Sequence, residues 1–375
     1  MSRLSTLVVF LVLCASCVVV RRSLPIPDPA TYPGREWQRI AVPATAGYSQ
    51  AGLDSVQAMV RSLRTSALLV VVGGRALLEY GDLAETSYVA SVRKSILSML
   101  FGRRVEDGTI RLDATLAQLG IDDVGGLLAT EREATVEDLL TARSGVYHPA
   151  SNSGDALAFA PPRGSQRHGT YYLYSNWDFN ALGTIYEEAT GANIYDALET
   201  ELARPIGMQD WYRLGQQKVA DTTRSIHPAY HIVLSTRDMA RIGWLMLRHG
   251  RWLGHQVVPE AWVRLSTRVA VPPTEIHPDT WRLQQVERGE GYGYLWWVRT
   301  TADTSDALYG SFGADGAYGQ HIQVMPRLDM VIAHKVVRRD GVPFRGGVTP
   351  AQWDALVHAV IAARCRPACA PSLAR

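Results

Sequence analysis

A serine and a lysine stand three positions apart at Ser91 and Lys94, in a chain of 375 residues that seldom uses lysine. Only Lys94, Lys218 and Lys335 occur, and the other 35 of the 38 basic residues are arginines. Arginine stays protonated in proteins, whereas a desolvated lysine can lose its proton and act as a base beside a nucleophile. The pair therefore predicts nucleophilic catalysis in which Lys94 activates the Ser91 hydroxyl.

The spacing of the pair is helical, because residues three apart share one face of a helix. The apolar run from Ser91 to Phe101 predicts a buried helix that ends at Gly102. Ser91 then lies in the first turn, where unpaired backbone N–H groups and the helix dipole favour an oxyanion. A neutral Lys94 near pH 7 requires a pKa about 3 units below the free value. The alternative is a helix-capping serine and a lysine that extends to solvent.

A second polar segment, Tyr174-Ser175-Asn176, precedes a predicted helix over residues 177–190. A serine that attacks a carbonyl needs one group to take its proton and another to protonate the leaving group. Tyr174 is a candidate for the second task. The alternatives are that Tyr174 packs in an aromatic cluster and that Asn176 caps the helix.

A third candidate segment is glycine-rich and covers residues 313–320. Glycines let one backbone approach another, so an exposed N–H at Ala317 could act with the N–H of Ser91 as a pair of oxyanion donors. Such a donor is typically worth about 3 kcal/mol of transition-state stabilisation. The alternative is an ordinary hairpin with a bulge.

Composition excludes several classes of protein. With 47% apolar residues the chain can fill one large core or two subdomains, and it is not a disordered protein. A net charge of +2 without a long basic run argues against nucleic acid as a partner. The scattered arginines are interpreted as solvated surface.

The order of patterns predicts an α+β fold. Two β-rich runs, 68–72 and 76–80, flank Gly73-Gly74 and predict a tight hairpin. Helical periodicity then runs from about 105 to 266, with secure helices at 135–143, 177–190, 194–203 and 236–248. Strands are predicted at 292–300, 307–312, 319–325 and 330–337, and a last helix at 350–363. The hairpin and the late strands should form one antiparallel sheet flanked by helices (48–104 and 286–365), beside a helical lobe (105–285).

The first residues indicate export. An apolar stretch at 4–20 follows Arg3, so residues 1–22 are interpreted as a signal peptide or as a lipoprotein or membrane anchor, with cleavage possible near Cys17. Prolines at 23–47 suggest a linker. The protein is then periplasmic or on the cell surface and contacts a membrane only through this segment. Cys365 and Cys369 could form a disulfide or remain free.

The order Ser-x-x-Lys, Tyr-x-Asn and glycine-rich strand resembles the penicillin-recognising serine hydrolases, specifically the class C β-lactamase-related esterase and amidase branch, from about residue 49 to 363. The resemblance implies a β-lactamase/transpeptidase-like fold and no cofactor or metal. It makes Ser91 the acylated nucleophile, Lys94 its base and Tyr174 the proton relay, with either Lys94 or Tyr174 as the general base. Asn176 would orient substrate or Lys94. The N–H groups of Ser91 and Ala317, the latter next to Gly316, would form the oxyanion hole.

One motif departs from the lactam-binding pattern, in which a lysine or histidine precedes the last glycine. Here Ala314-Asp315-Gly316 offers no cation, and Asp315 is expected to repel a substrate carboxylate. This disfavours β-lactamase or D-Ala-D-Ala carboxypeptidase activity, which remain alternatives. It favours a neutral or cationic small-molecule ester or amide.

Other classes fit less well. An α/β-hydrolase needs Gly-x-Ser-x-Gly, which the sequence lacks. His227 and His231 are four apart, but Pro228 stands between them and no His-Glu-x-x-His motif occurs, so a metal site is not favoured. A non-catalytic, membrane-anchored binding or sensor domain of the same fold remains the non-enzymatic alternative.

Overall fold

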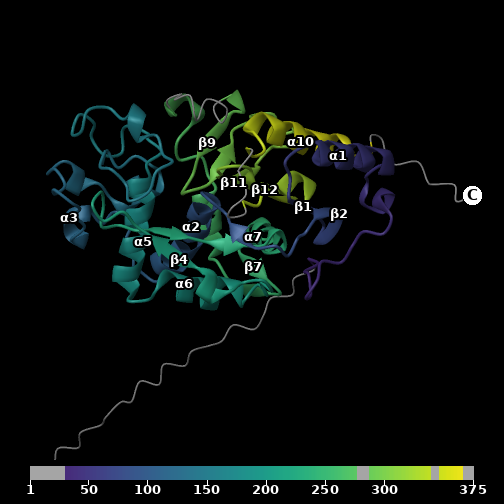
Figure 1. Cartoon of the computed structure of the whole chain (residues 1–375), viewed down its shortest axis with the longest axis horizontal. Coiled ribbons are helices and arrows are strands. Elements are labelled where there is room, and N and C mark those ends of the chain that lie inside the picture. The colour runs from purple at the N-terminus through teal and green to yellow at the C-terminus, as the bar shows by residue number, and fades with distance from the viewer. Residues whose placement is uncertain (1–29, 277–286, 339–345, 366–375) are drawn as a thin grey trace, which may run out of the picture.

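The computed structural model describes residues 30–276, 287–338 and 346–365. At its centre is a seven-stranded antiparallel sheet in the order β2-β1-β13-β12-β11-β10-β9 (Figure 1). Its strands are β1 (Ala67–Val72), β2 (Arg75–Gly81), β9 (Glu290–Tyr292), β10 (Trp297–Arg299), β11 (Phe312–Gly316), β12 (Gln320–Met325) and β13 (Met330–Lys335). The early hairpin thus joins the late strands in one sheet, which confirms the predicted α+β fold.

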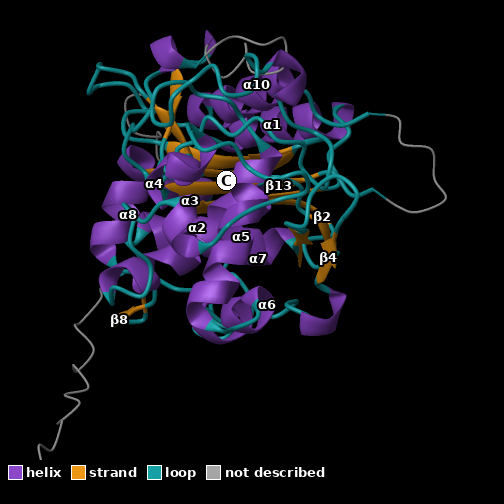
Figure 2. Ribbon diagram, turned by 90° about the vertical axis from the view of Figure 1, so that its left-hand side faces the viewer, coloured by secondary structure: helices purple, strands orange, loops and turns teal. Residues whose placement is uncertain are grey.

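Helices cover both faces of this sheet (Figure 2). One face carries α1 (Gln50–Ser62) and α10 (Pro350–Ala362), and the other carries α2 (Val92–Glu106) and α7 (Thr236–Leu247). Side chains alternate between the faces of a strand, so Leu68 and Val70 join the core beneath α1 and α10 while Leu69 and Val71 join the core beneath α2 and α7. Burial on both faces explains why β1 is an unbroken apolar run.

The β1–β2 hairpin turns where the sequence predicts. Gly73 and Gly74 both have positive φ, 57° and 76°, as the favoured two-residue hairpin turn requires. Gly74 also has no room for a side chain, because a Cβ there would lie 2.0 Å from the carbonyl oxygen of Thr31. The two glycines therefore allow the tight turn, and Gly74 also allows the segment around Thr31 to pack against it.

Helix α2 is longer than predicted, because it continues through Gly102 to Glu106. A Cβ at residue 102 would lie 2.7 Å from the indole of Trp262, in α8 (Glu260–Ser266). The glycine thus permits a close approach of two helices instead of ending one. Arg103 and Arg104 lie in the last turn, as expected.

Between β3 and β9 the structure has a helix at each of the four predicted places, but the first ends at Leu140 instead of residue 143, and the third becomes π-helical after Ala197. Its helices are α3 (Leu116–Leu119), α4 (Val136–Leu140), α5 (Asn176–Thr190), α6 (Ile194–Ala197), a π-helical turn (Leu198–Ala203), α7 and α8. Its short strands are β3 (Ser87–Tyr88), β4 (Gln217–Val219), β5 (Ala229–His231), β6 (Val233–Leu234), β7 (Arg251–Trp252) and β8 (His255–Gln256). Helix α4 begins with a capping box, in which Thr135 and Asp138 each accept the other's backbone N–H.

Two of the predicted late strands are wrong in detail. The segment 292–300 is not one strand, because the chain turns back between β9 and β10, where Leu295 has φ 65°. The segment 307–312 is mostly turns, since Asp306 accepts the N–H of Leu308 through its side chain and β11 begins only at Phe312. Local turn chemistry overrides the apolar pattern in both places.

The predicted linker partly packs on the domain. Trp37 is buried, and the N–H of Ile40 donates to the carbonyl of Ala76 at 2.8 Å, so the folded body starts before residue 48. Residues 1–22, with the predicted export signal, lie outside the described residues. Among the helices that the structure describes, none is long and apolar enough to cross a membrane. Cys365 is disulfide-bonded, and Cys369 lies outside the described residues.

Candidate active site

The side chains of Ser91, Lys94 and Tyr174 meet in a short chain of hydrogen bonds. Lys94 Nζ lies 3.0 Å from Ser91 Oγ and 2.8 Å from the Tyr174 hydroxyl. Ser91 is partly exposed, whereas Lys94 is 2% exposed. An alcohol open to solvent is thus backed by a buried amine and a phenol, which is a geometry suited to acyl transfer.

Helix α2 positions the serine and the lysine. Ser91 occupies the N-cap position of the helix, but its side chain makes no capping hydrogen bond and instead contacts Lys94. The alternative of a capping serine and a solvent-directed lysine is therefore wrong. Ala90, just before Ser91, has φ 48°, a strained value of the kind that gathers at functional sites.

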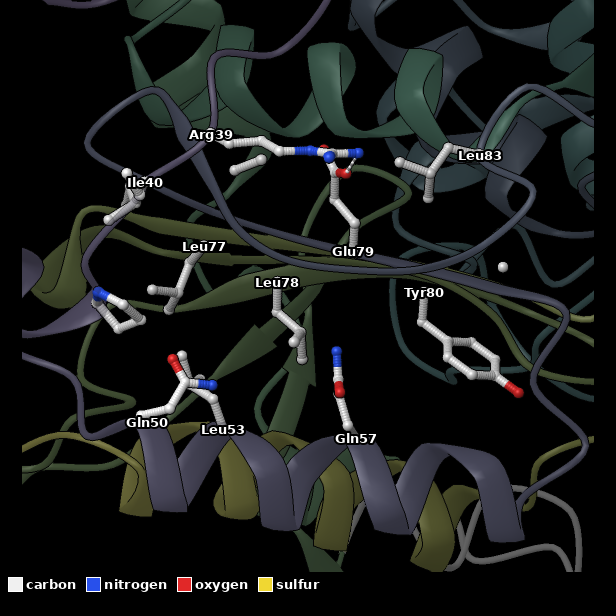
Figure 3. Close-up of a pocket in the computed structure, with 14 residues that line it drawn as sticks. Arg39, Ile40, Gln50, Leu53, Gln57, Leu77, Leu78, Glu79, Tyr80 and Leu83 are labelled. Atoms are coloured by element: carbon white, nitrogen blue, oxygen red, sulfur yellow. Dashed lines mark ion pairs between the residues drawn. The ribbon is translucent and has the colours of Figure 1, made fainter.

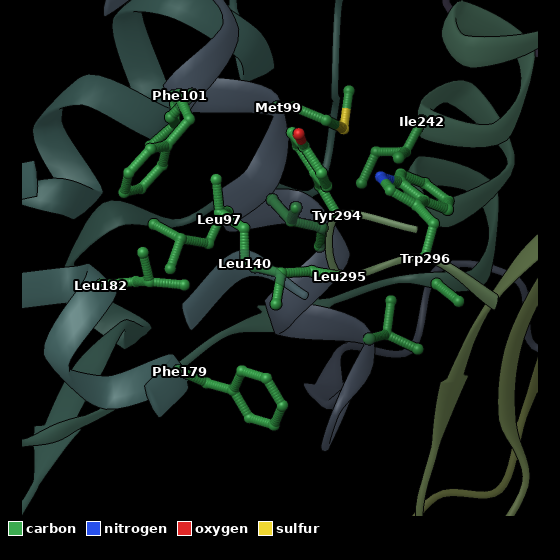
Figure 4. Packing of buried hydrophobic residues seen from close by; sticks show 14 of the residues in the cluster. Leu97, Met99, Phe101, Leu140, Phe179, Leu182, Ile242, Tyr294, Leu295 and Trp296 are labelled. Atoms are coloured by element: carbon green, nitrogen blue, oxygen red, sulfur yellow. The ribbon is translucent and has the colours of Figure 1, made fainter. Parts of the chain in front are cut away.

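A packed apolar layer fixes the position of α2. Leu97 of the helix packs in one buried cluster with Leu140 of α4, Leu182 of α5 and Leu295 of the β9–β10 turn (Figure 4). A second contact is polar, because the hydroxyl of Ser95 donates to the carbonyl oxygen of Leu295 at 2.6 Å. Ser91 and Lys94 thus lie on a helix that several elements hold in place, which favours a fixed geometry.

Tyr174 packs in an aromatic cluster and also contacts Lys94. Its ring belongs to an aromatic cluster, 4.8 Å from the Phe179 ring and 6.1 Å from that of Trp297. Its hydroxyl nevertheless contacts Lys94. The Lys94 ammonium nitrogen lies 4.2 Å from the centroid of the Tyr174 ring and 4.6 Å from that of Phe179. The aromatic cluster therefore both places the phenol and supplies the low-polarity surroundings of the amine.

Asn176 is not the cap of α5, because Ser175 accepts the N–H of Trp177 and Asn176 is the first helical residue. The Asn176 side chain is 2% exposed, and its Nδ2 donates to the carbonyl oxygen of Ser153 at 3.0 Å. This bond fixes the orientation of the amide, since only the nitrogen can donate. Asn176 Oδ1 is left buried without a hydrogen-bond partner.

The glycine-rich segment lies against the start of α2. It forms a β11–β12 hairpin, as in the alternative interpretation, but the register is continuous and has no bulge, and Gly316 lies opposite Gln320. A Cβ on Gly316 would lie 2.6 Å from the carbonyl oxygen of Val89 and 3.2 Å from the nitrogen of Ser91. Ala317, the next residue, is exposed. The hairpin therefore brings the main chain of residues 316–317 to the nucleophile, where two oxyanion donors would be needed.

A model of the beta-lactamase family matches residues 56–356 of the chain. The chain belongs to the beta-lactamase family. Members of this family are serine hydrolases. The site lies on the three segments whose order already resembled the penicillin-recognising enzymes.

Solved structures of similar fold extend over most of the chain. A putative 6-aminohexanoate-dimer hydrolase from Bacillus anthracis has 17% sequence identity and a TM-score of 0.58, with 89% of this chain and 88% of that chain covered. A putative beta-lactamase from Bacteroides dorei has 17% sequence identity and a TM-score of 0.61, with 84% of this chain and 98% of that chain covered. A penicillin-binding protein homologue from Caulobacter crescentus has 13% sequence identity and a TM-score of 0.60, with 84% of this chain and 99% of that chain covered. These likenesses establish the fold.

In this beta-lactamase-family protein Asp315 does not face the nucleophile, which corrects the expectation that it repels a substrate carboxylate. Asp315 Oδ1 accepts from His321 Nδ1 at 2.9 Å, and His321 stacks on Trp353 of α10. The carboxylate therefore projects to the α10 face of the sheet, opposite α2. Arg288 Nη2 also donates a hydrogen bond to Asp315 Oδ2, at 3.1 Å. His321 and Arg288 together hold the pKa of Asp315 well below its usual value, despite burial.

The sequence interpretation missed two buried arginines. Arg93, inside the Ser-x-x-Lys motif, and Arg241 of α7 are both buried, although the arginines were interpreted as surface residues. The signal for Arg93 was its position, because residues flanked by a nucleophile and its base on a buried helix are themselves expected to be buried.

The paired histidines do not form a metal site. His227 contacts Thr184 Oγ1 and the carbonyl oxygen of Asp122, both at 3.0 Å. His231 instead stacks on Tyr88. Among the residues that the structure describes, no three metal-ligating side chains come together.

A cavity of about 500 Å³ lies away from the serine, between α1 and the edge strand β2 (Figure 3). Leu53 and Gln57 line it from the helix, and Leu78 and Tyr80 line it from the strand. Its lining residues include no serine, cysteine, lysine or histidine. The cavity therefore lacks a nucleophile, and the Ser91 region remains the candidate active site.

Proposed function

We propose that this protein is an esterase or small-molecule amidase that works through a covalent acyl-enzyme on Ser91. The observation that carries the proposal is the continuous contact from Ser91 Oγ through Lys94 Nζ to the Tyr174 hydroxyl, at 3.0 and 2.8 Å. A nucleophile, a base and a proton donor are all within hydrogen-bonding distance, as acyl transfer needs.

The reaction would have two halves. Neutral Lys94 takes the proton of Ser91 as Oγ attacks the substrate carbonyl, and the backbone N–H groups of Ser91 and Ala317 hold the oxyanion. The proton then passes through Tyr174 to the leaving oxygen or nitrogen as its bond to the carbonyl carbon breaks. Water attacks the acyl ester in the second half, and its proton returns along the same path to Ser91 Oγ.

The substrate is proposed to be uncharged or cationic near the acyl group. The third motif carries Ala314 where lactam-binding relatives have a cation, and Asp315 projects to the opposite face of the sheet. The orphaned acceptor Asn176 Oδ1 favours a substrate with an N–H donor beside the scissile carbonyl. The similar fold of a putative 6-aminohexanoate-dimer hydrolase agrees with a small amide as the substrate class.

A covalent probe tests the proposal. A fluorophosphonate should label Ser91 in the wild-type protein, identified by peptide mass spectrometry, and Ser91→Ala should abolish labelling. Ser98→Ala is a matched control, because Ser98 is a buried serine of the same helix. Labelling on another residue, or no adduct and no ester turnover, would instead support a non-catalytic binding or sensor domain.

Substrate comparison ranks the activities. A nitrophenyl ester, a chromogenic cephalosporin and a D-Ala-D-Ala peptide should be assayed side by side. We expect measurable ester cleavage with weak or absent lactam turnover. Rapid cephalosporin hydrolysis would identify a β-lactamase, and release of D-alanine would identify a carboxypeptidase.

Export remains part of the proposal. We propose that residues 1–22 direct the protein out of the cytoplasm, because the apolar stretch 4–20 follows a basic residue. The N-terminus of the mature protein, read by mass spectrometry after expression with its own leader, tests this. An N-terminal sequence that retains Leu4 to Val20 in a cytoplasmic fraction would contradict it.

A further inference from the structure

One guanidinium beside the nucleophile is buried without an opposite charge. Arg93 stands between Ser91 and Lys94 and is 1% exposed. Its Nη2 donates to Asn180 Oδ1 at 3.2 Å, while its Nη1 is buried without a hydrogen-bond partner. Among the described residues no carboxylate forms an ion pair with it. Buried charges are normally paired, so an unpaired one here calls for a functional explanation.

The groups around Arg93 are aromatic. Its guanidinium carbon lies 4.6 Å from the centroid of the Tyr230 ring of β5, a contact that stabilises a cation. The titratable groups that face Arg93 come from every neighbouring element: Tyr88 of β3, Tyr174 before α5, Tyr195 of α6, and Tyr230 and His231 of β5. Burial and the charge of Arg93 together lower the pKa of His231 to about 4. Arg93 is therefore a source of positive potential inside the domain.

Arg93 and Lys94 reach the same turn of α5. Arg93 contacts Asn180, and Lys94 Nζ lies 4.6 Å from the ring of the preceding residue, Phe179. Two cations so placed in a buried region destabilise each other. An arginine cannot release its proton in a protein, so the lysine is the group that becomes neutral.

We propose that Arg93 is a positioning residue whose permanent charge keeps Lys94 in the neutral form that takes the proton of Ser91. The inference rests on the proposed function, because it explains how the base of that reaction is prepared.

Titration of Lys94 tests the inference without turnover. The chain has three lysines, so lysine-selective ¹⁵N and ¹³C labelling gives three side-chain signals, and Lys218→Arg helps to assign them. We expect Arg93→Met to raise the titration midpoint of Lys94 by about one pH unit or more, since the repulsion is lost. Arg93→Lys should restore most of the wild-type midpoint. Arg103→Met, the same change at an exposed position of α2, should leave the Lys94 midpoint unchanged.

A second variant neutralises Arg93 without deleting it. Asn180→Asp places a carboxylate at the position that now accepts the hydrogen bond of Arg93, and it should also raise the midpoint of Lys94. Because that carboxylate would also attract Lys94 directly, Arg93→Gln, which keeps a donor for Asn180 and removes only the charge, decides the matter if Arg93→Met does not fold. An unchanged midpoint in the variant or variants that fold, or a cationic Lys94 at pH 7 in the wild-type protein, would overturn the inference.

Kinetics separate this effect from a loss of structure. The acidic limb of the pH profile of kcat/KM for an ester should move to higher pH by the same amount as the Lys94 midpoint. A merely structural role would lower the rate at every pH and leave the limb in place, which would contradict the proposal. Failure of the proposed function is distinguishable, because it would appear as an absent Ser91 adduct in the wild-type protein whatever the titration of Lys94.

Discussion

The main chain of Gly316 lies directly against the amide nitrogen of Ser91, with only 3.2 Å between that nitrogen and the place where a Cβ would stand. The contact joins the sheet to the first turn of α2 and sets the space in which a substrate carbonyl oxygen would lie. It also explains why the strand ends in a glycine at this point, because a side chain would collide with the carbonyl of Val89 at 2.6 Å.

We therefore expect Gly316→Ala to lower kcat/KM for an ester by about 100-fold or more, since the strand must move away and one oxyanion donor is displaced. The protein should still fold, as judged by circular dichroism. Gly34→Ala is the control, because a Cβ at residue 34 meets nothing within 4 Å. Unchanged ester turnover in Gly316→Ala would show that the hairpin does not form the oxyanion site.

The Tyr174 hydroxyl provides a second prediction. Tyr174→Phe keeps the ring that packs on Phe179 and Trp297 and removes only the contact with Lys94. We expect ester turnover to fall by about 10²- to 10³-fold, the usual contribution of a proton-transfer group, with little change in the free energy of unfolding. Tyr186→Phe, on the same side of the sheet but further along α5, should leave turnover near the wild-type rate.

Much of this site could be predicted from the sequence because its residues come in short local patterns. Ser91 and Lys94 are brought together by one helical turn, and the Gly73-Gly74 pair specifies its own hairpin. Tyr174 needed the order of motifs along the chain, since nothing local to it shows that its hydroxyl reaches Lys94 across 80 residues. Local geometry and motif order thus predicted which three side chains meet.

The errors arose where long-range packing decides the outcome. Gly102 looked like a helix end, but the distant Trp262 determines its role. Asp315 looked like a charge in the site, but strand alternation directs it to Arg288 and His321 on the other face. Arg93 lies on a helix that is predicted to be buried, but its partners Tyr230 and Asn180 are distant in the sequence, and no local pattern connects them to it.

Packing of α2 on α8 gives a stability prediction. Alanine normally favours a helix over glycine by about 1 kcal/mol, but a Cβ at Gly102 would lie 2.7 Å from the indole of Trp262. We expect Gly102→Ala to lower the free energy of unfolding by about 1–3 kcal/mol, because overpacking outweighs helix propensity. Urea denaturation measures it. A more stable variant would mean that Trp262 moves aside without cost.

The buried charges of Arg288, Glu290 and Asp315 give a prediction about how stability depends on pH. Glu290 of β9 pairs with Arg288 at 2.7 Å, but burial raises its pKa to about 7. The folded protein then binds a proton on Glu290 between roughly pH 4.5 and 7 that the unfolded chain does not bind, so this group's contribution to stability declines as pH rises through that window.

Glu290→Gln should remove this decline. Relative to the wild-type protein, we expect the variant to gain on the order of 1–3 kcal/mol in free energy of unfolding between pH 5 and pH 8, measured by urea denaturation at both values. Glu260→Gln, at the partly exposed start of α8, should show no such change. Asp315 acts in the opposite direction, because its lowered pKa provides stability that is lost only as the solution becomes strongly acidic. A difference between Glu290→Gln and wild type that stays constant from pH 5 to 8 would mean that Glu290 remains ionised throughout, with Arg288 compensating fully for its burial.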